Sequence, residues 1–470
     1  MRRSREMGAE RKSGRRKRGR RVLLLVAVVG LIWLGVAALR PGPSPTVEIS
    51  TDRPGIGPRT EVDVTVDEPR RGIARITVEL VQGGFRELLV DNGYETLEPW
   101  AFWGEKTAAE TLEAAVGRSL QPELTEGEAV LRVTAWPAPA YLRRGSPTVE
   151  ELVLPVRLTP PLLEVLSSQH YVAQGGAEAV VYRVGASSVE DGVEVGEWFF
   201  PGHPLPGGEV QERFALFAVP YDVADASGVR LRARDDVGNE FARPFVDQFF
   251  SRPMRQTTIR LSEPFMQKVV AEILSQTPEM RDRGDLLANY LAINGELRRR
   301  NAETLIELAG RSQPTFAWRR VFLPMPNAQV MSAFADRRTY VLDGEAVDQQ
   351  DHLGFDLASV RQAPIPAANT GRVVLARYFG IYGNAVVLDH GYGLLSLYAH
   401  LSAIRVAEGE AVERGQIVGT SGETGLAGGD HLHFSMLLYG LPVDPREWWD
   451  LHWLQDRLER KLGPALPLEE

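Results

Sequence analysis

The feature that most constrains this chain is an uninterrupted apolar segment near its N-terminus, VLLLVAVVGLIWLGVAAL, from Val22 to Leu39. Its length is enough for a helix across the apolar core of a bilayer, which needs about 17 to 25 residues. A cleaved secretory signal is the alternative, because Ala37 and Ala38 are small, but the apolar core of such a signal is usually shorter than about 15 residues. We therefore expect a retained transmembrane helix over residues 22–39.

The segment before this helix, residues 1–21, is strongly basic, with eleven Lys and Arg against two Glu. Basic flanks of a membrane span stay in the cytoplasm. We therefore predict a cytoplasmic tail and a single-pass protein whose chain after Arg40 lies outside the cytoplasmic membrane. The whole chain carries a formal charge of −9 and the tail contributes +9, which leaves −18 on the remainder. An acidic exported part does not suit nucleic-acid binding, which depends on neutralising phosphates.

Most of the remaining sequence has the alternation of β-strands. Period-two runs such as Val62, Val64 and Val66 predict strands with one buried face. They follow a proline-rich linker, PGPSP, and recur over 46–158 and 160–250. We predict two β-sandwich modules there, the second immunoglobulin-like, which serve as spacers or docking surfaces.

Residues 258–312 have a helical period instead. Phe265, Val269 and Ile273 fall on one stripe, and Ser262 is placed to cap the helix start, so a short helical connector is expected. The period returns to short strands and glycine turns over 321–448, and the remaining residues, 449–470, are expected to form a C-terminal tail. The predicted fold is therefore mostly β, with an antiparallel C-terminal domain.

Histidine is scarce in this chain, with eight in 470 residues, and cysteine is absent. Without thiolates, a zinc site here needs His, carboxylate or water as ligands. In HLHFSM, strand alternation places His431 and His433 on one face, and in HLGFDL it does the same for His352 and Asp356. A helix would also bring His352 and Asp356 together, but Gly354 and the strict alternation favour the strand.

If the two polar faces meet, His352, Asp356 and one of His431 and His433 form a three-ligand set with a fourth position open. That is the composition of a catalytic rather than a structural zinc site. His400, in SLYAHLS, and the member of the pair that is not a ligand then supply imidazoles near the metal for proton transfer. His390, which stands beside glycines, is assigned to a turn.

Four segments resemble the lysostaphin-type, or LytM-like, zinc metallopeptidases, which are murein endopeptidases. They are HLGFD, HGYGLLSLYAHLS, GEAVERGQIVGTSGETG and GGDHLHFSM, in that order and spacing. The resemblance covers about 321–448 and implies antiparallel sheets with an open groove. It also implies one zinc ion held by His352, Asp356 and His433, with His400 and His431 in catalysis. Some relatives use a tyrosine upstream of the first motif, and Tyr340 matches it loosely.

Location and resemblance together predict a membrane-anchored zinc endopeptidase that hydrolyses peptide cross-links of peptidoglycan on the periplasmic or wall-facing side. The bond is left open between a glycine bridge and a D-alanyl cross-link. The alternative is a non-enzymatic LytM-like regulator or scaffold that activates a cell-wall amidase or binds a divisome component. Some members of the family have lost ligands and act in this way, but here all five positions are filled.

Overall fold

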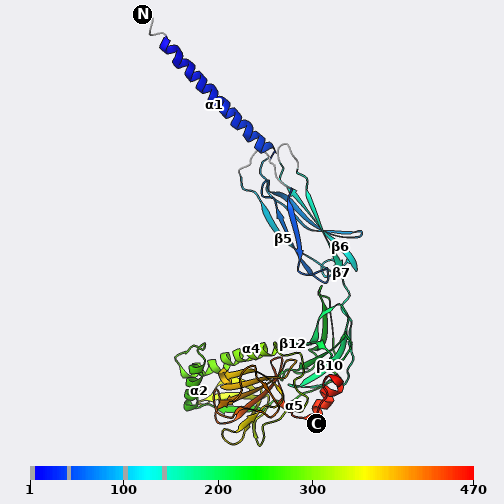
Figure 1. Cartoon of the computed structure of the whole chain (residues 1–470), viewed down its shortest axis with the longest axis vertical. Helices are drawn as coiled ribbons and strands as arrows, with labels where there is room; N and C mark the ends of the chain where they lie inside the picture. Colours follow the sequence, from blue (N-terminus) through cyan, green and yellow to red (C-terminus); the bar gives the residue numbers. More distant parts are fainter. Residues whose placement is uncertain (1–5, 40–43, 99–103, 140–144, 470) are drawn as a thin grey trace. The chain divides into compact units, whose positions relative to one another are not determined.

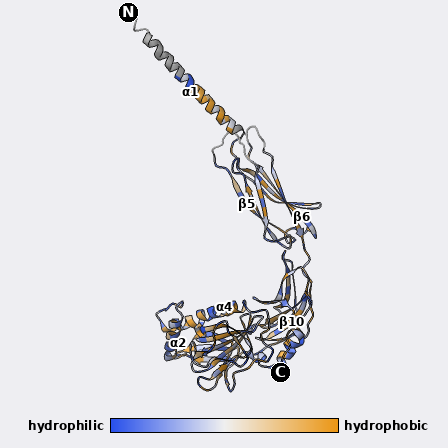
Figure 2. Ribbon diagram, in the orientation of Figure 1, coloured by the Kyte–Doolittle hydropathy of each residue, from blue (hydrophilic) through white to orange (hydrophobic). Residues whose placement is uncertain are grey.

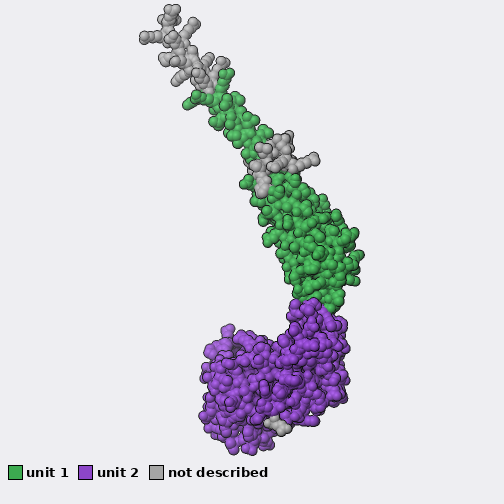
Figure 3. Space-filling model, turned by 45° about the vertical axis from the view of Figure 1, so that its right-hand side comes forward, with its two compact units in different colours: residues 1–160, 235–239 green, residues 161–234, 240–470 purple. Residues whose placement is uncertain are grey.

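The computed structural model describes residues 6–39, 44–98, 104–139 and 145–469. It divides into two compact units, residues 1–160 with 235–239 and residues 161–234 with 240–470 (Figures 1 and 3). The predicted mostly β fold with an N-terminal apolar helix is confirmed. The start of the predicted basic tail and most of the proline-rich linker lie outside the described residues.

Helix α1 (Glu6–Leu39) contains the predicted apolar segment. Its stretch Arg18–Val36 has a mean hydropathy of 2.0 and none of it is buried, which suffices by length and composition for a membrane span. Figure 2 shows this half of α1 as the hydrophobic part of the helix. The basic residues up to Arg21 continue the same helix.

Unit 1 contains two antiparallel sheets that share one core. The predicted alternation explains the packing, since Val62, Val64 and Val66 are all fully buried while the residues between them face outward. In spatial order, the sheets consist of β1 (Thr46–Thr51), β2 (Thr60–Asp67) and β5 (Ala109–Val116), and of β4 (Phe85–Gly93), β3 (Ile73–Gln82), β6 (Gly127–Pro137) and β7 (Thr148–Val156).

The second β region begins unit 2 and forms two four-stranded sheets and a parallel pair, β9 (Tyr171–Ala173) with β17 (Gln248–Phe250). Its immunoglobulin-like character stays a prediction. One sheet has the order β13 (His203–Pro204), β14 (Glu212–Ala218), β10 (Ala177–Val184) and β8 (Leu163–Val165); the other has β12 (Trp198–Pro201), β11 (Ser188–Val195), β15 (Val229–Asp235) and β16 (Glu240–Arg243). Its core continues into the C-terminal region, where Phe214 packs on Phe316 and Tyr392 at ring distances of 5.7 and 4.9 Å.

The connector is helical, but it begins with a strand. Residues 258–260 belong to β18 (Gln256–Arg260), which pairs with β20 (Asp336–Leu342), because its alternating side chains fit the edge of that sheet. Ser262 stands at the N-cap position of α2, yet its side chain makes no capping hydrogen bond. The helical elements are α2 (Glu263–Gln276), α3 (Leu286–Ala292), the π-helix η1 (Ile293–Leu297) and α4 (Arg298–Ala309).

The C-terminal region is built on an eight-stranded sheet. Its path is β19 (Gln329–Ser332), β22 (Phe355–Ala358), β30 (Leu432–Leu438), β26 (Leu394–Leu401), β25 (Asn384–Asp389), β24 (Gly371–Tyr378) and β28 (Ala411–Val412), with β31 (Leu441–Val443) on β30. A smaller sheet joins β18, β20 and β21 (Glu345–His352). A turn separates β28 from β29 (Ile417–Thr420).

Residues 449–469, expected to form a C-terminal tail, belong to the folded part of unit 2. They are folded in short helical turns that follow α5 (Pro445–Trp448), and Leu454, Leu458 and Leu462 are buried in the core of unit 2. Lys461 forms a buried ion pair with Glu178 of β10. This segment therefore joins the C-terminal region to the second β region.

Candidate metal centre

Three side chains from three strands converge on one point of unit 2. His352 ends β21, Asp356 lies in β22, and His433 lies in β30 directly opposite Asp356. His352 Nε2 lies 2.9 Å from Asp356 Oδ1 and 3.0 Å from His433 Nδ1, and the last two atoms are 3.1 Å apart. These three atoms could together hold a metal ion.

HLGFDL is not the single strand that alternation predicts. β21 ends at His352 and β22 begins at Phe355, so the two ligand candidates lie in different sheets. The chain turns at Gly354, where a Cβ atom would lie 2.5 Å from Ser435 Oγ and 2.7 Å from His433 Nε2. Only glycine leaves room for the His433 ring at this turn.

The far side of each candidate ligand is fixed by its own partner. His352 Nδ1 lies 3.1 Å from Ala333 O, and His433 Nε2 lies 3.0 Å from Ser435 Oγ, whose hydroxyl donates to Leu353 O. These contacts favour the tautomers that leave a lone pair on the inner nitrogen of each ring, the usual arrangement behind metal-ligating histidines.

The distances fit a metal of zinc's size. Ligand bonds of about 2.0–2.1 Å in a tetrahedron separate the ligand atoms by about 3.3 Å. The three observed separations of 2.9–3.1 Å need to open by only a few tenths of an ångström. Two imidazoles and a carboxylate are also a donor set that zinc prefers, so the residues present fit this ion.

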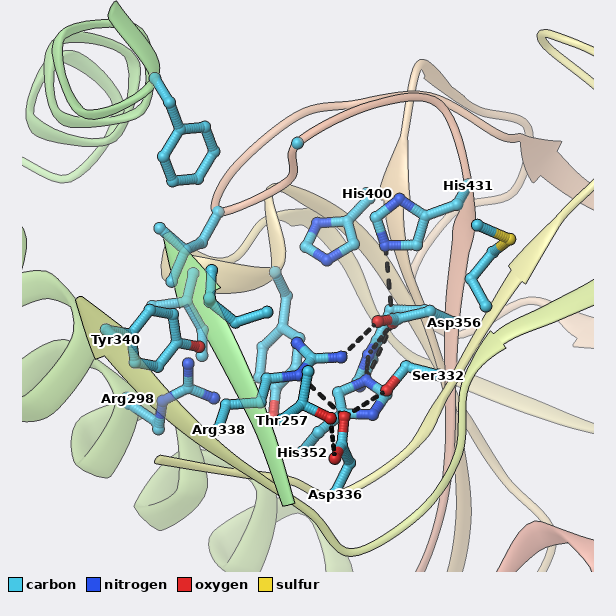
Figure 4. Close-up of a pocket in the computed structure, with 18 of the residues that line it drawn as sticks. Thr257, Arg298, Ser332, Asp336, Arg338, Tyr340, His352, Asp356, His400 and His431 are labelled. Atoms are coloured by element: carbon cyan, nitrogen blue, oxygen red, sulfur yellow. Dashed lines mark hydrogen bonds and ion pairs between the residues drawn. The ribbon is translucent and has the colours of Figure 1, made fainter. Parts of the chain in front are cut away.

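Asp356 is kept ionised in its buried position. Burial raises the pKa of this carboxyl, but the charge of His352 and the hydrogen bonds from the surrounding histidines outweigh it, so that the pKa lies well below its usual range. Arg338 Nη2 donates to Asp356 Oδ2 at 2.7 Å, which leaves Oδ1 for the cluster. Figure 4 shows Arg338 and the histidines around this carboxylate.

His400 and His431 lie beside the cluster, with ring centroids 4.9 Å apart. Burial, reinforced by the charges of His431 and His433, lowers the pKa of His400 well below its usual range. Burial also acts to lower the pKa of His431, but its hydrogen bond to Asp356 and that residue's charge outweigh this and raise it. The two imidazoles therefore favour opposite protonation states.

Local structure orients both of these rings. His400 has a left-handed backbone with φ of 61°, a conformation that is costly for a residue other than glycine and that clusters at functional sites. Its Nδ1 lies 2.8 Å from Thr424 O, and His431 Nδ1 lies 2.8 Å from Gly429 O. The Nε2 atom of His400 is thus left for the cavity side, and that of His431 faces Asp356 Oδ1 at 3.5 Å.

These residues line a cavity of about 440 Å³. Tyr340 and Arg338 also line it, and both alternate with Asp336 along β20. The strand period could therefore have predicted that Arg338 lies on the same face as Tyr340. Tyr382, whose ring lies 5.7 Å from that of His433, was missed because it lies in a short turn without periodicity. His390 is buried away from the cluster, against Thr370 O and Ser396.

Two histidines and a carboxylate at one point of a cavity, with two further histidines beside them, have the composition of the metal sites of hydrolases. The chain carries a domain of Peptidase family M23, whose family model matches residues 350–445. The resemblance on which the sequence analysis relied is thereby confirmed, and all five candidate residues lie within the matched range.

Curated relatives match parts of the chain. It is 28% identical over 264 residues to the peptidoglycan DD-endopeptidase ShyA of Vibrio cholerae serotype O1, which covers 53% of this chain and 56% of that protein. It is 42% identical over 94 residues to the DD-carboxypeptidase/endopeptidase Mpg of Neisseria meningitidis serogroup B, which covers 20% of this chain and 22% of that one. The matches thus span about half or less of these relatives.

Among solved structures, the chain is similar to a crystal structure of a putative peptidase M23 from Pseudomonas aeruginosa. The sequences are 21% identical, the match covers 59% of this chain and 94% of the other, and the TM-score is 0.37.

Proposed function

We propose that this chain is a membrane-anchored zinc metalloendopeptidase that hydrolyses peptide cross-links of peptidoglycan. One observation carries the proposal: the inner atoms of His352, Asp356 and His433 converge while a separate partner holds the outer side of each. The family of the domain and the peptidoglycan endopeptidases among its relatives support the substrate class. A bound zinc ion would polarise the scissile carbonyl and make water more acidic.

The two remaining histidines divide the proton chemistry between them. His400 favours the neutral form, and the contact of its Nδ1 with Thr424 O leaves Nε2 free to accept a proton from the attacking water. His431 favours the protonated form, and its Nε2 lies 3.5 Å from Asp356 Oδ1. With that oxygen engaged as a ligand, the Nε2–H can instead donate a hydrogen bond to the oxyanion that develops on the carbonyl. Their opposite preferences suit an acid and a base that act in one step.

Helix α1 is proposed as the anchor. Its apolar stretch follows a basic segment, so the positive-inside rule puts the N-terminus in the cytoplasm and the peptidase domain on the outer side of the membrane, where the wall lies. A protease-protection assay on sealed spheroplasts tests this orientation. Cleavage of the C-terminal region by added protease is expected, and its full protection would contradict the proposal.

The activity is tested with the full chain in detergent, loaded with zinc and incubated with cross-linked muropeptides. Mass spectrometry is expected to detect separated stem peptides, and their release should be lost with a chelator and in His400→Ala. If zinc is bound and no cross-link is cleaved, the enzymatic proposal fails and the regulator of a cell-wall amidase or divisome component takes its place.

A further inference from the structure

The cavity beside the metal cluster is lined by more cations than anions. Four arginines line it, Arg255, Arg260, Arg298 and Arg338, against two aspartates, Asp336 and Asp356. Both aspartates are already engaged: Asp356 by Arg338 and the histidines, and Asp336 by hydroxyl groups of Thr257 and Ser332 at 2.6 and 3.0 Å. Since the chain outside its basic tail is acidic, overall composition does not explain this cationic lining.

Arg298 occupies a special place among these arginines. A second cavity, of about 490 Å³, is lined by parts of the second β region and of α4. Only four of the described residues line both cavities, and they are Arg298, His352, Tyr382 and His433. Two of these are candidate metal ligands, so Arg298 lines both cavities together with part of the metal cluster. Figure 4 shows Arg298 among the residues of the first cavity.

The guanidinium of Arg298 is held in a defined orientation. Nε donates to Asn294 O at 3.0 Å and Nη2 to Asn294 Oδ1 at 2.6 Å. Asn294 is fully buried and donates through Nδ2 to Asp348. Asn294 belongs to the π-helix η1, directly before Arg298, and such short π segments often mark functional sites.

No carboxylate among the described residues pairs with Arg298, and Nη1 has no hydrogen-bond partner among them. A guanidinium that is positioned by neutral groups and left without an anion is suited to bind a carboxylate through parallel N–H donors. Asp348 accepts the hydrogen bond of Asn294 Nδ2 and is not itself an ion-pair partner of Arg298.

We propose that Arg298 binds a free carboxylate of the substrate next to the scissile bond, so that the cleft selects acidic peptides over their amidated forms. This rests on the proposed function for the identity of the peptide as a peptidoglycan stem. Arg255, directly before β18, and Arg260, its last residue, are both exposed; they add positive potential along the same cavity and favour the approach of an anionic ligand. The amidated peptide keeps nearly the same shape, but it loses the charge and has an NH2 donor in place of one acceptor oxygen.

The test is a binding measurement with two probes. One is a D-alanyl cross-linked muropeptide dimer with free carboxylates, and the other is the same dimer with its carboxylates converted to carboxamides. The full zinc-loaded chain carries His400→Ala so that neither probe is consumed, and fluorescence anisotropy gives each affinity. We expect the acidic probe to bind about tenfold more tightly, the size of a charge-assisted pair of hydrogen bonds.

Arg298→Gln should remove most of this preference without weakening binding of the amidated probe. Arg299→Gln is the matched control, because it removes the same charge from the exposed neighbouring residue on α4, which lines neither cavity. Equal affinities of the His400→Ala chain with Arg298 intact for both probes, or a preference that survives Arg298→Gln, would overturn the inference. If Arg298→Gln does not fold, Arg298→Lys replaces it, and an unreduced preference in that variant overturns the inference as well.

Cleavage of the same dimers by the chain with His400 intact tests the proposed function separately. Binding that depends on charge and on Arg298, without any cleavage, would reject the peptidase and keep the carboxylate site. Cleavage of both dimers at equal rates, with equal affinities, would keep the peptidase and reject the carboxylate site.

Discussion

Gly354→Ala should weaken zinc binding while the chain still folds. The reason is that the new methyl group meets a candidate ligand rather than the hydrophobic core. The added Cβ would lie 2.7 Å from His433 Nε2 and 2.5 Å from Ser435 Oγ, whereas ordinary contacts begin at 3.4 Å. The ring therefore has to move by roughly 0.7 Å, and metal sites tolerate only about 0.2 Å in ligand distance. Disturbing such supporting contacts typically costs about 10–100-fold in metal affinity.

The assay is competition for zinc between the full chain and a chromophoric chelator, together with thermal unfolding in EDTA. Without metal, the collision is expected to cost about 1–3 kcal/mol of unfolding free energy, as overpacking usually does. Gly428→Ala is the matched control, because Gly428 lines the same cavity and a Cβ there meets nothing within 4 Å. Unchanged zinc affinity in Gly354→Ala would refute the convergence of His433 with the other two ligands.

Further predictions concern the same unit. Ser435→Ala should lower zinc affinity about 10–100-fold by freeing His433 Nε2, measured in the same competition assay, and unchanged affinity would exclude a tautomer role for Ser435. Excess zinc should raise the melting temperature, with about 4 kcal/mol of stabilisation at a thousandfold excess over Kd, and His352→Ala should abolish the effect in calorimetry. Lys461→Ala should lower the free energy of unfolding by about 3–5 kcal/mol, because it leaves Glu178 buried without its partner. Lys268→Ala, which removes the exposed pair with Glu423, should lower it by at most about 1 kcal/mol. Equal losses of the two variants in urea unfolding would contradict this. Burial raises the pKa of Glu447 to about 8 although Arg252 opposes it, so this group's contribution to stability is present below about pH 4.5 and is lost as the pH rises through 8. Glu447→Gln should flatten that slope in melts taken across this range, and an unchanged slope would assign it to other groups.

The metal cluster could be anticipated because strand alternation is a local signal. His431 and His433 do share a face, and β30 places His433 opposite Asp356, as two facing polar edges predict. The path between His352 and Asp356 could not be anticipated from alternation. A continuous strand and a strand interrupted at Gly354 have the same alternation of apolar residues. Only the close approach of the His433 ring to Gly354 reveals the interruption, and that approach is not visible in the sequence.

Residues that act across long distances in sequence gave weaker signals. Arg338 was accessible, since it alternates with Asp336 and Tyr340 on β20, but its role depends on where β22 lies. Tyr382 comes from a turn between two strands, where no period exists. The helical spacing of Leu451, Leu454 and Leu458 could have shown that the last residues are folded, and the burial of Leu454 and Leu458 follows from it.

The second β region makes buried contacts with the peptidase domain within unit 2. Strand β30, which carries His433, leads through β31 to α5, where Glu447 accepts a hydrogen bond from Ala177 N and binds Arg252. Asp444, at the start of α5, binds the same arginine. The strand that supplies a candidate ligand is thus tied at its end to the sheet of the second β region, and Phe214 of that sheet packs under Tyr392. A spacer would need none of these buried contacts. We infer that this region supports the geometry of the metal cluster, since ligands must be held within fractions of an ångström and such precision comes from rigid packing around them.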